Sequence, residues 1–245
     1  MSENITSHPF VLVTGAAHRL GREIALSLAN QGFSIGLHYH SSQDAAVQTA
    51  AQIEAIGSPA HLLQADLRDP QQINQLFETI ASLPYKLSGL VNSAAIMPVS
   101  RLDQSGVDIW DEIFSLNLRA AWLCSQKAAK LIMPGSGWII NISDAGINKA
   151  WMNYAIYNLS KASLQHLTRL LARTYAPFIR VNAIAPGFVL RNQEILDEDW
   201  QRMKRRLPLQ ESGQLQDIGQ AAIFLINQSA ITGQTITIDG GYQLV

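Results

Sequence analysis

The sequence predicts a single α/β domain over residues 1–245, in which a doubly wound, seven-stranded parallel sheet carries helices on both faces. Short runs rich in β-branched residues alternate along the chain with longer segments of helical periodicity. Helical crossovers between successive strands make the strands parallel and cover both faces of the sheet. With 245 residues, 47% of them hydrophobic, and no internal linker, repeat or low-complexity tract, the chain can bury one large core.

The expected strands are short apolar runs that leave room for a helix between them. They lie at residues 10–15, 33–39, 61–66, 87–94, 137–143, 179–187 and 234–241. Between them, apolar residues recur at the spacing of one helix face. The clearest expected helices lie at residues 21–31, 44–57, 70–82, 120–133 and 152–172.

Two segments depart from this alternation. Residues 188–213 are highly charged and lie between the end of a strand and the next helix. They fit either a solvated pair of surface helices or a lid over the substrate, because doubly wound sheets bind ligands at the carboxyl ends of their strands. Residues 1–8 are polar, and we expect them to form a disordered tail.

Charge and composition exclude several classes of function. The formal net charge is −1 and the one basic run is KRR at 204–206, so we expect no nucleic-acid partner. The sequence shows no signal-peptide pattern and no span long enough for a bilayer, so we expect a cytoplasmic protein with a small-molecule substrate and no membrane partner. The six histidines and Cys124 lack metal-ligand spacing, and Cys124 fits a small buried hydrophobe.

The segment TGAAHRLG, residues 14–21, follows the first expected strand and opens the first helix. Glycines in such a Rossmann turn let the backbone approach a pyrophosphate, which the free N–H groups of the helix N-terminus then bind. Gly15 and Gly21 fit these roles. Arg19 replaces the usual middle glycine and brings a positive charge to the phosphates and the substrate site. The alternative is a turn of purely structural use.

The end of the second expected strand predicts NADP as the cofactor. NAD enzymes place an acid about 20 residues past the glycines, where it bonds the ribose 2′-hydroxyl. Here that stretch reads LHYHSS and contains no acid to repel a 2′-phosphate. His40, Ser41 and Ser42 can donate hydrogen bonds to the phosphate, and His18 can add another. The alternative is that His38 and His40 simply end a strand.

Asp66 follows the third expected strand, in QADLRD. A carboxylate at this place is suited to hold the edge of the adenine. The alternative is that Asp66 caps the helix that begins near Pro70.

Tyr157 and Lys161 form the candidate reducing pair. They are four residues apart on one expected helix and therefore share a face. We expect the ammonium of Lys161 to lower the pKa of the phenol from about 10, which makes Tyr157 a proton donor near neutral pH. Tyr154 is the weaker candidate, because the residue four positions after it is the uncharged Asn158.

The whole chain resembles the short-chain dehydrogenase/reductases. The motifs that carry the resemblance are TG-x-x-x-R-x-G, the Asn92 segment, Asn117, Tyr157-x-x-x-Lys161, Pro186-Gly187 and the closing TGQTITIDGG. Within that superfamily it is most similar to the pteridine reductases. Three features point there: Arg19 in the first turn, LHYH after the second strand, and Asp144 where most of the superfamily has serine.

The resemblance implies NADPH-dependent reduction of a dihydropterin or dihydrofolate by a homotetramer. It implies Asp144, Tyr157 and Lys161 as catalytic residues, and we add Asn117 to that set. The expected cofactor-binding residues are Gly15, His18, Arg19, Leu20, Gly21, His40, Ser41, Ser42, Asp66, Leu67, Ser93, Ala94, Ile142, Tyr157, Lys161, Pro186, Gly187 and Val189. The expected substrate-binding residues are Arg19, Ala95, Met97, Asp144 and Tyr157.

The chemistry of a carboxylate favours a pterin over a ketone. An ionised Asp144 offers only acceptors, and its charge opposes an alkoxide that develops beside it. A pterin has an amino group and ring N–H groups that donate, and ring nitrogens that need protons. The alternative is that Ser143 serves a carbonyl after a shift of one residue. We prefer Asp144, because its offset of thirteen residues to Tyr157 matches the family.

One departure from the pteridine reductases keeps other functions open. These enzymes stack an aromatic side chain on the pterin, whereas NSAAIMP here places Ala95 and Met97 at the corresponding positions. A methionine contributes about 0.3–1.5 kcal/mol against a ring. Ser93 and Ala94 also differ from the superfamily, and we expect only backbone contacts from them. The alternatives are a carbonyl reductase of an oxoacyl thioester or sugar-like ketone, and a non-catalytic NADP-binding module.

The expected helices at 120–133 and 152–172 are apolar over more than one face, which a sheet alone does not cover. We therefore expect two-fold interfaces built on them and on the C-terminal GGYQLV. The alternative is that both helices are buried within one chain.

Overall fold

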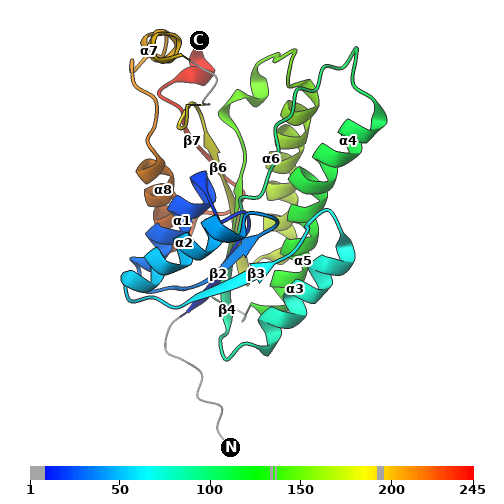
Figure 1. The fold of residues 1–245 in the computed structure, drawn as a ribbon, viewed down its shortest axis with the longest axis vertical. Helices are drawn as coiled ribbons and strands as arrows, with labels where there is room; N and C mark the ends of the chain where they lie inside the picture. Colours follow the sequence, from blue (N-terminus) through cyan, green and yellow to red (C-terminus); the bar gives the residue numbers. More distant parts are fainter. Residues whose placement is uncertain (1–8, 133–134, 136, 192–195) are drawn as a thin grey trace, which may run out of the picture.

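Seven parallel strands form one sheet in the order β3-β2-β1-β4-β5-β6-β7 (Figure 1). The computed structural model describes residues 9–132, 135, 137–191 and 196–245, so the expected tail lies outside the described residues. Every neighbouring pair of strands is parallel, which confirms the predicted doubly wound α/β fold. The strands are β1 (Phe10–Val13), β2 (Ser34–Tyr39), β3 (Ala60–Gln64), β4 (Leu87–Asn92), β5 (Gly137–Ile142), β6 (Ile179–Pro186) and β7 (Thr235–Ile238).

Helices cover both faces of the sheet, and each face has its own core (Figure 1). On one face, α1, α2 and α8 bury residues such as Ile24 and Leu225. On the other face, α3, α5 and α6 bury residues such as Phe77 and Cys124, and the predicted burial of Cys124 is confirmed. The helices are α1 (Arg19–Ala29), α2 (Gln43–Ala55), α3 (Pro70–Ser82), α4 (Val107–Phe114), α5 (Ala121–Leu131), α6 (Ala155–Tyr175), α7 (Asp197–Arg205) and α8 (Leu215–Asn227).

Helix α3 illustrates how local sequence sets these boundaries. Asp69 is its N-cap and accepts a hydrogen bond of 2.8 Å from the Gln71 N–H, while Pro70 opens the first turn. Its buried stripe contains Ile73 and Phe77, one turn apart. Each such side chain contributes about 1.5–3 kcal/mol on burial. Asp69 is the N-cap of this helix, so the alternative that Asp66 caps it is wrong.

A π-helical turn joins α4 to α5. It spans η1 (Ser115–Ala120), so α4, η1 and α5 run on as one long helix with an enlarged turn in its middle. Such turns are frequent at functional sites, because the extra residue redirects one side chain. Here the enlarged turn holds the buried Asn117.

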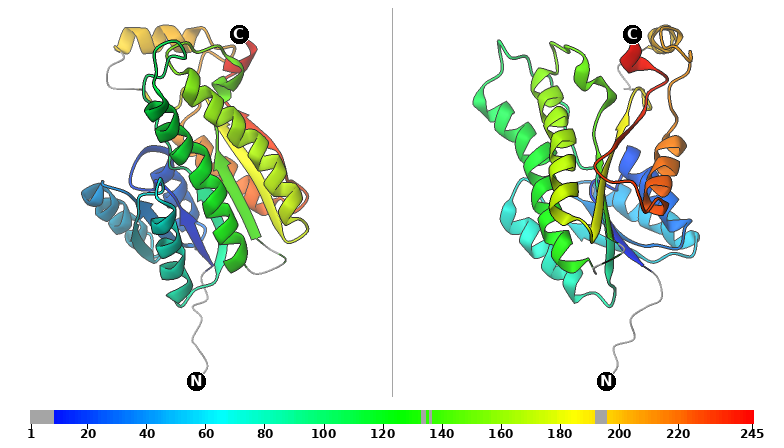
Figure 2. Two further views of the ribbon diagram at one scale, coloured as in Figure 1. Left: turned by 90° about the vertical axis from the view of Figure 1, so that its right-hand side faces the viewer. Right: turned by 180° about the vertical axis from the view of Figure 1, so that it is seen from behind.

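The charged segment at 188–213 contains α7, none of whose residues is buried. Residues 192–195 of this segment lie outside the described part of the chain. Helix α7 lies at the end of the molecule that also holds the C-terminus, beyond the carboxyl end of β6 (Figure 2). Within the described ranges, no helix has the length and hydropathy needed to cross a membrane.

Candidate active site

A cavity of about 1260 Å³ opens at the carboxyl ends of the strands. It lies where the strand order reverses between β1 and β4, the usual ligand site of a doubly wound sheet. Every predicted cofactor-binding and substrate-binding residue lines this cavity, and so do Asp144, Tyr157 and Lys161. Of the predicted site residues, Asn117 alone does not line it.

The first turn is shaped for close approach of a phosphate to the backbone. Gly15 has a φ of 65°, and a Cβ there would come within 2.9 Å of Ala94 Cα. A Cβ on Gly21 would overlap the carbonyl oxygen of Gly15. His18 at the N-cap makes no capping hydrogen bond with its side chain, so the first N–H groups of α1 face a possible anion uncapped. The turn therefore fits a dinucleotide pyrophosphate.

The side chain of His38 is hydrogen-bonded to the backbone of this turn, a role that the sequence did not indicate. Its Nδ1 accepts a hydrogen bond of 3.1 Å from the Gly15 N–H, and its Nε2 lies 3.1 Å from the Ala65 carbonyl oxygen. Burial lowers the pKa of His38 to about 4, which keeps the ring neutral and Nδ1 free to accept. The signal in the sequence was a polar residue inside an otherwise apolar strand.

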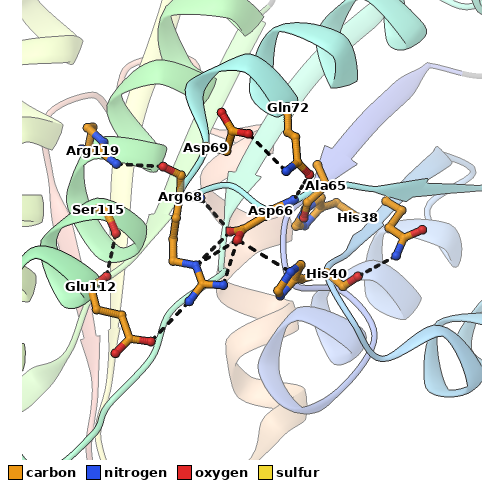
Figure 3. A network of polar contacts seen from close by, with 11 residues as sticks. His38, His40, Ala65, Asp66, Arg68, Asp69, Gln72, Glu112, Ser115 and Arg119 are labelled. Carbon is orange, nitrogen blue, oxygen red and sulfur yellow. Dashed lines mark hydrogen bonds and ion pairs between the residues drawn. The ribbon is translucent and has the colours of Figure 1, made fainter. Parts of the chain in front are cut away.

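The predicted adenine end of the cavity is an ionic network (Figure 3). Arg68 binds both carboxylate oxygens of Asp66 at 2.8–3.1 Å, and this hydrogen bonding holds the pKa of the carboxyl below its usual range. His40 Nε2 lies 3.7 Å from Asp66 Oδ2. Arg68 also contacts Glu112 of α4 at 3.3 Å, and its carbonyl oxygen accepts a 2.8 Å hydrogen bond from Arg119. Sequence reasoning missed Arg68, although it stands two residues after Asp66.

The predicted catalytic residues meet at the inner wall of the cavity. The Tyr157 hydroxyl donates a hydrogen bond of 2.8 Å to Asp144 Oδ2, while Asp144 Oδ1 accepts one of 2.7 Å from the Gly146 N–H. Lys161 Nζ donates to the Ile142 carbonyl oxygen at 2.8 Å and lies 5.9 Å from the centroid of the Tyr157 ring. Asp144 follows the end of β5 and caps the short 3-10 turn η2 (Ala145–Asn148), while α6 supplies the phenol and the amine.

The expected effect of Lys161 on the phenol is wrong. Burial and the neighbouring carboxylate of Asp144 raise the pKa of Tyr157 well above its ordinary value, while the charge of Arg19 acts in the lowering direction. The reason is that Asp144 bonds the phenol directly, whereas Lys161 donates to a backbone carbonyl. Burial raises the pKa of Asp144 and lowers that of Lys161 to about 8. The carboxylate of Asp144 therefore acts on the pKa of the phenol in the direction opposite to the one expected of Lys161.

Ser143 does not take the place of Asp144. Its hydroxyl donates a hydrogen bond of 3.1 Å to the Lys161 carbonyl oxygen. The phenol of Tyr157 is bonded to Asp144, in the register that the thirteen-residue offset predicts.

We assigned Asn117 to the catalytic residues, but its side chain is hydrogen-bonded to the backbone of Ile96 and to Ser160. Its Oδ1 accepts a 2.9 Å hydrogen bond from the Ile96 N–H, and its Nδ2 donates to the Ile96 carbonyl at 3.0 Å and to Ser160 Oγ at 3.1 Å. The side chain thus fixes the loop after β4 against α6. We treat Asn117 as a positioning residue and not as a member of the catalytic set.

The loop after β4 contributes its backbone to the site. The N–H groups of Ser93 and Ala94 donate to Thr14 Oγ1 at 2.9 and 3.1 Å, which ties this loop to the first turn. Ala95 and Met97 line the cavity, and 44% of Met97 is exposed. No ring comes from these two positions.

Several lining residues come from segments that are far apart in the sequence. Outside the charged segment at 188–213, for which a lid over the substrate was one interpretation, their own segments gave no sign that they bind a ligand. The lining residues that were not named from the sequence include Arg68, Arg101, Trp151, Met152, Asn153, Phe188, Trp200, Met203 and Tyr242.

Comparison with known proteins places this architecture in a family. Residues 15–243 match the family model described as enoyl-(acyl carrier protein) reductase. The 3-oxoacyl-[acyl-carrier-protein] reductase FabG of Staphylococcus aureus is 34% identical over 236 residues, which cover 94% of this chain and 96% of that protein. A short-chain type dehydrogenase/reductase of Picea abies is 32% identical over 245 residues, covering 94% of this chain and 90% of that one.

A solved structure with the same fold is FolM alternative dihydrofolate reductase 1 from Brucella canis, complexed with NADP. It matches with a TM-score of 0.91 and 32% identity over 100% of this chain and 97% of that chain. The family model matches residues 15–243, and these two matches cover 94% and 100% of the chain. The chain therefore belongs to the short-chain dehydrogenase/reductase superfamily.

Proposed function

We propose that this protein is an NADPH-dependent reductase of a dihydropterin or dihydrofolate-type substrate. The observation that carries the proposal is the 2.8 Å hydrogen bond from Tyr157 to Asp144 in the wall of the cavity. A carboxylate there favours a substrate that brings hydrogen-bond donors and takes up a proton on nitrogen.

NADPH fits the residues that the cavity presents. Gly15 and Gly21 leave room for the pyrophosphate, and His40, Ser41 and Ser42 line the end where a 2′-phosphate would bind. Arg68 neutralises the nearby Asp66, so that carboxylate repels a phosphate less. When bound, NADPH supplies the hydride.

The proton comes from this chain's own residues. Burial raises the pKa of Asp144, which is the direction that favours a proton on its carboxyl beside the phenol. The structure has the Tyr157 hydroxyl donating to Asp144 Oδ2 at 2.8 Å. For the transfer, the hydroxyl turns to a ring nitrogen of the substrate and the protonated Asp144 carboxyl donates to the phenol oxygen in its place. As the Tyr157 O–H bond breaks, the carboxyl proton passes to the phenolate oxygen, which leaves Asp144 ionised. Lys161, held by the Ile142 carbonyl, places its amine beside this pair.

The relatives support two substrate classes. The Brucella canis protein is described as a dihydrofolate reductase and was crystallised with NADP, which favours the pterin class and NADPH. The Staphylococcus aureus relative is a 3-oxoacyl-[acyl-carrier-protein] reductase of similar identity. The absence of a ring at Ala95 and Met97 favours this second class, reduction of an oxoacyl thioester. The complete Asp144, Tyr157 and Lys161 group argues against a non-catalytic NADP-binding module.

Competing substrates test the proposal. NADPH oxidation is measured with dihydrobiopterin, dihydrofolate and an acetoacetyl thioester, each also with NADH. We expect turnover of at least one dihydropteridine and a preference for NADPH. Turnover of the thioester alone would select the second class. Tight NADPH binding without turnover of any of the three would select the non-catalytic module.

We also propose a homotetramer with a lid. The face formed by α4, α5 and α6 exposes Val107, Trp110, Trp122 and Leu159 to between 40% and 69%, and large apolar side chains exposed together on one face are typical of protein–protein contact sites. Two-fold interfaces on this face, which adds α4 to the two helices predicted from the sequence, would bury it, and the C-terminal GGYQLV stays part of the proposed interface. For the lid, Trp200 and Met203 of the segment at 188–213 line the cavity.

A further inference from the structure

Four aromatic rings from separate parts of the chain line the substrate side of the cavity. They are Trp151, Phe188, Trp200 and Tyr242, which we call the aromatic wall. The Phe188 ring lies 4.5 Å from that of Tyr242 and 6.4 Å from that of Trp200, measured between centroids. Trp151 lies 6.3 Å from Tyr242. These separations are those of interacting aromatic pairs, so the rings form one continuous surface.

The aromatic wall stands next to the catalytic group. The Trp151 indole packs on Gly146, where a Cβ would overlap it, and the Gly146 N–H is the one that binds Asp144 Oδ1 at 2.7 Å. Asn158 Nδ2 holds the same loop through the Gly146 carbonyl at 2.7 Å. Burial raises the pKa of the Tyr242 phenol, and the charge of the Asp144 carboxylate acts in the same direction.

Tyr242 has a fixed orientation and a free donor. Its oxygen accepts a 2.8 Å hydrogen bond from Trp151 Nε1, and Lys149 Nζ lies 5.1 Å from its ring centroid. Within the described ranges, its own O–H has no acceptor. A ring held in this way can both contact a flat molecule and donate one hydrogen bond to it.

We propose that the aromatic wall receives the flat ring of the substrate, with Tyr242 as the positioning residue that donates to a ring acceptor. The C-terminal segment thereby takes over the recognition that the loop after β4, with Ala95 and Met97, lacks the rings to provide. This inference rests on the proposed function for the identity of the substrate, a pteridine. The wall itself would accept a flat heteroaromatic ring whether or not that ring is reduced.

The test measures binding and turnover separately. Oxidised biopterin is titrated by calorimetry into the protein saturated with NADP⁺, and the KM and kcat for dihydrobiopterin are measured with NADPH. The variants are Tyr242→Leu, Tyr242→Phe and Met97→Ala. Phe178→Leu is the matched control, because Phe178 is 55% exposed and stands just before the start of β6, at the opposite end of that strand from the cavity.

We expect Tyr242→Leu to weaken biopterin binding on the order of tenfold and to raise the KM for dihydrobiopterin equally, with NADP⁺ affinity unchanged. Tyr242→Phe keeps the ring and should lose only about threefold. Met97→Ala should lose less than Tyr242→Leu, and Phe178→Leu should match the unmodified protein. A merely structural role for Tyr242 would instead lower NADP⁺ affinity and thermal stability together.

The outcomes separate this inference from the proposed function. Dihydrobiopterin turnover with equal biopterin affinity in Tyr242→Leu and the unmodified protein overturns the wall and leaves the proposed function standing. Tight biopterin binding that depends on Tyr242, without turnover of any dihydropteridine, supports the wall and overturns the proposed function. No biopterin binding by the unmodified protein overturns the wall, whereas the proposed function is overturned separately, by the absence of turnover with both dihydrobiopterin and dihydrofolate. A larger loss of biopterin affinity in Met97→Ala than in Tyr242→Leu would overturn the wall, because it would show that the loop after β4 recognises the substrate ring.

Discussion

Replacing Asp144 by serine or asparagine should change the turnover of the two candidate substrate classes in different directions. The carboxylate is bonded to the Tyr157 hydroxyl at 2.8 Å and to the Gly146 N–H at 2.7 Å, so either change acts directly on the phenol. Asp144→Asn keeps the shape and removes only the charge and the exchangeable proton. Asp144→Ser shortens the side chain and restores the hydroxyl that most of the superfamily carries at this position.

The expected sizes follow from the contacts. If Asp144 returns a proton to Tyr157, both variants lose an acid–base group, which typically lowers kcat by about 10²–10⁴. For a ketone, the same changes remove the carboxylate that raises the pKa of Tyr157, and the phenol becomes a stronger acid facing the carbonyl oxygen. Dihydropterin turnover should therefore fall while turnover of the thioester holds or rises.

The assay is steady-state NADPH oxidation with dihydrobiopterin and with an acetoacetyl thioester, and the melting temperature of each variant serves as a check on folding. Ser143→Ala is the control. It loses a 3.1 Å hydrogen bond to the Lys161 carbonyl, worth about 1 kcal/mol of stability, and should keep dihydropterin turnover. The reasoning is refuted if Asp144→Ser retains full dihydropterin turnover while Ser143→Ala abolishes it.

Three further predictions concern the general acid, a buried histidine and assembly. Tyr157→Phe should lower kcat by about 10²–10⁴ with NADPH affinity nearly unchanged, and Lys161→Ala should impair both; near-normal kcat in the Phe variant would move proton donation to Tyr154 or Asp144. The pKa of His38 is lowered from 6.5 to about 4, so the unfolded chain binds more protons between these values and stability falls as pH drops from 6.5 toward 4. The loss is roughly 3 kcal/mol, and urea titrations should show it shrink in His38→Asn, which does not titrate. Light scattering at micromolar protein should give a tetramer mass, and a monomer mass would contradict the interfaces proposed on α4, α5 and α6.

Sequence alone predicted the features that depend on local spacing. The alternation of strands and helices fixes a parallel sheet, and a parallel sheet brings its carboxyl ends together, so Gly15, Asp144 and Tyr157 had to meet. The position of Gly21 was predictable for a similar reason, because the close approach that it permits, to the Gly15 carbonyl oxygen, lies within one turn, whereas Gly15 approaches Ala94 of the loop after β4. The choice of Asp144 over Ser143 depended on an offset of thirteen residues, and the hydrogen bond to Tyr157 has that register.

The features that sequence did not predict depend on contacts between distant segments. The four-residue spacing suggested that Lys161 lowers the pKa of the Tyr157 phenol. Burial and the hydrogen bond to Asp144 raise that pKa instead, and neither can be read from the helical spacing. The aromatic wall joins Trp151 to Tyr242 across 91 positions of sequence. Asn117 was placed by its motif among the catalytic residues, yet its hydrogen bonds show a side chain that holds a loop.

At position 19, thermal stability and ligand recognition favour different residues. Its φ of 53° lies in the left-handed region, which costs a residue other than glycine about 1–2 kcal/mol. Arg19→Gly would remove that cost, so selection of random variants for thermal resistance alone should recover glycine at this position. Selection for turnover should restore the arginine, because Arg19 lines the cavity and its charge opposes the rise in the pKa of Tyr157 that burial and Asp144 cause. The identity of residue 19 in such a population would thus report which of the two properties was under selection.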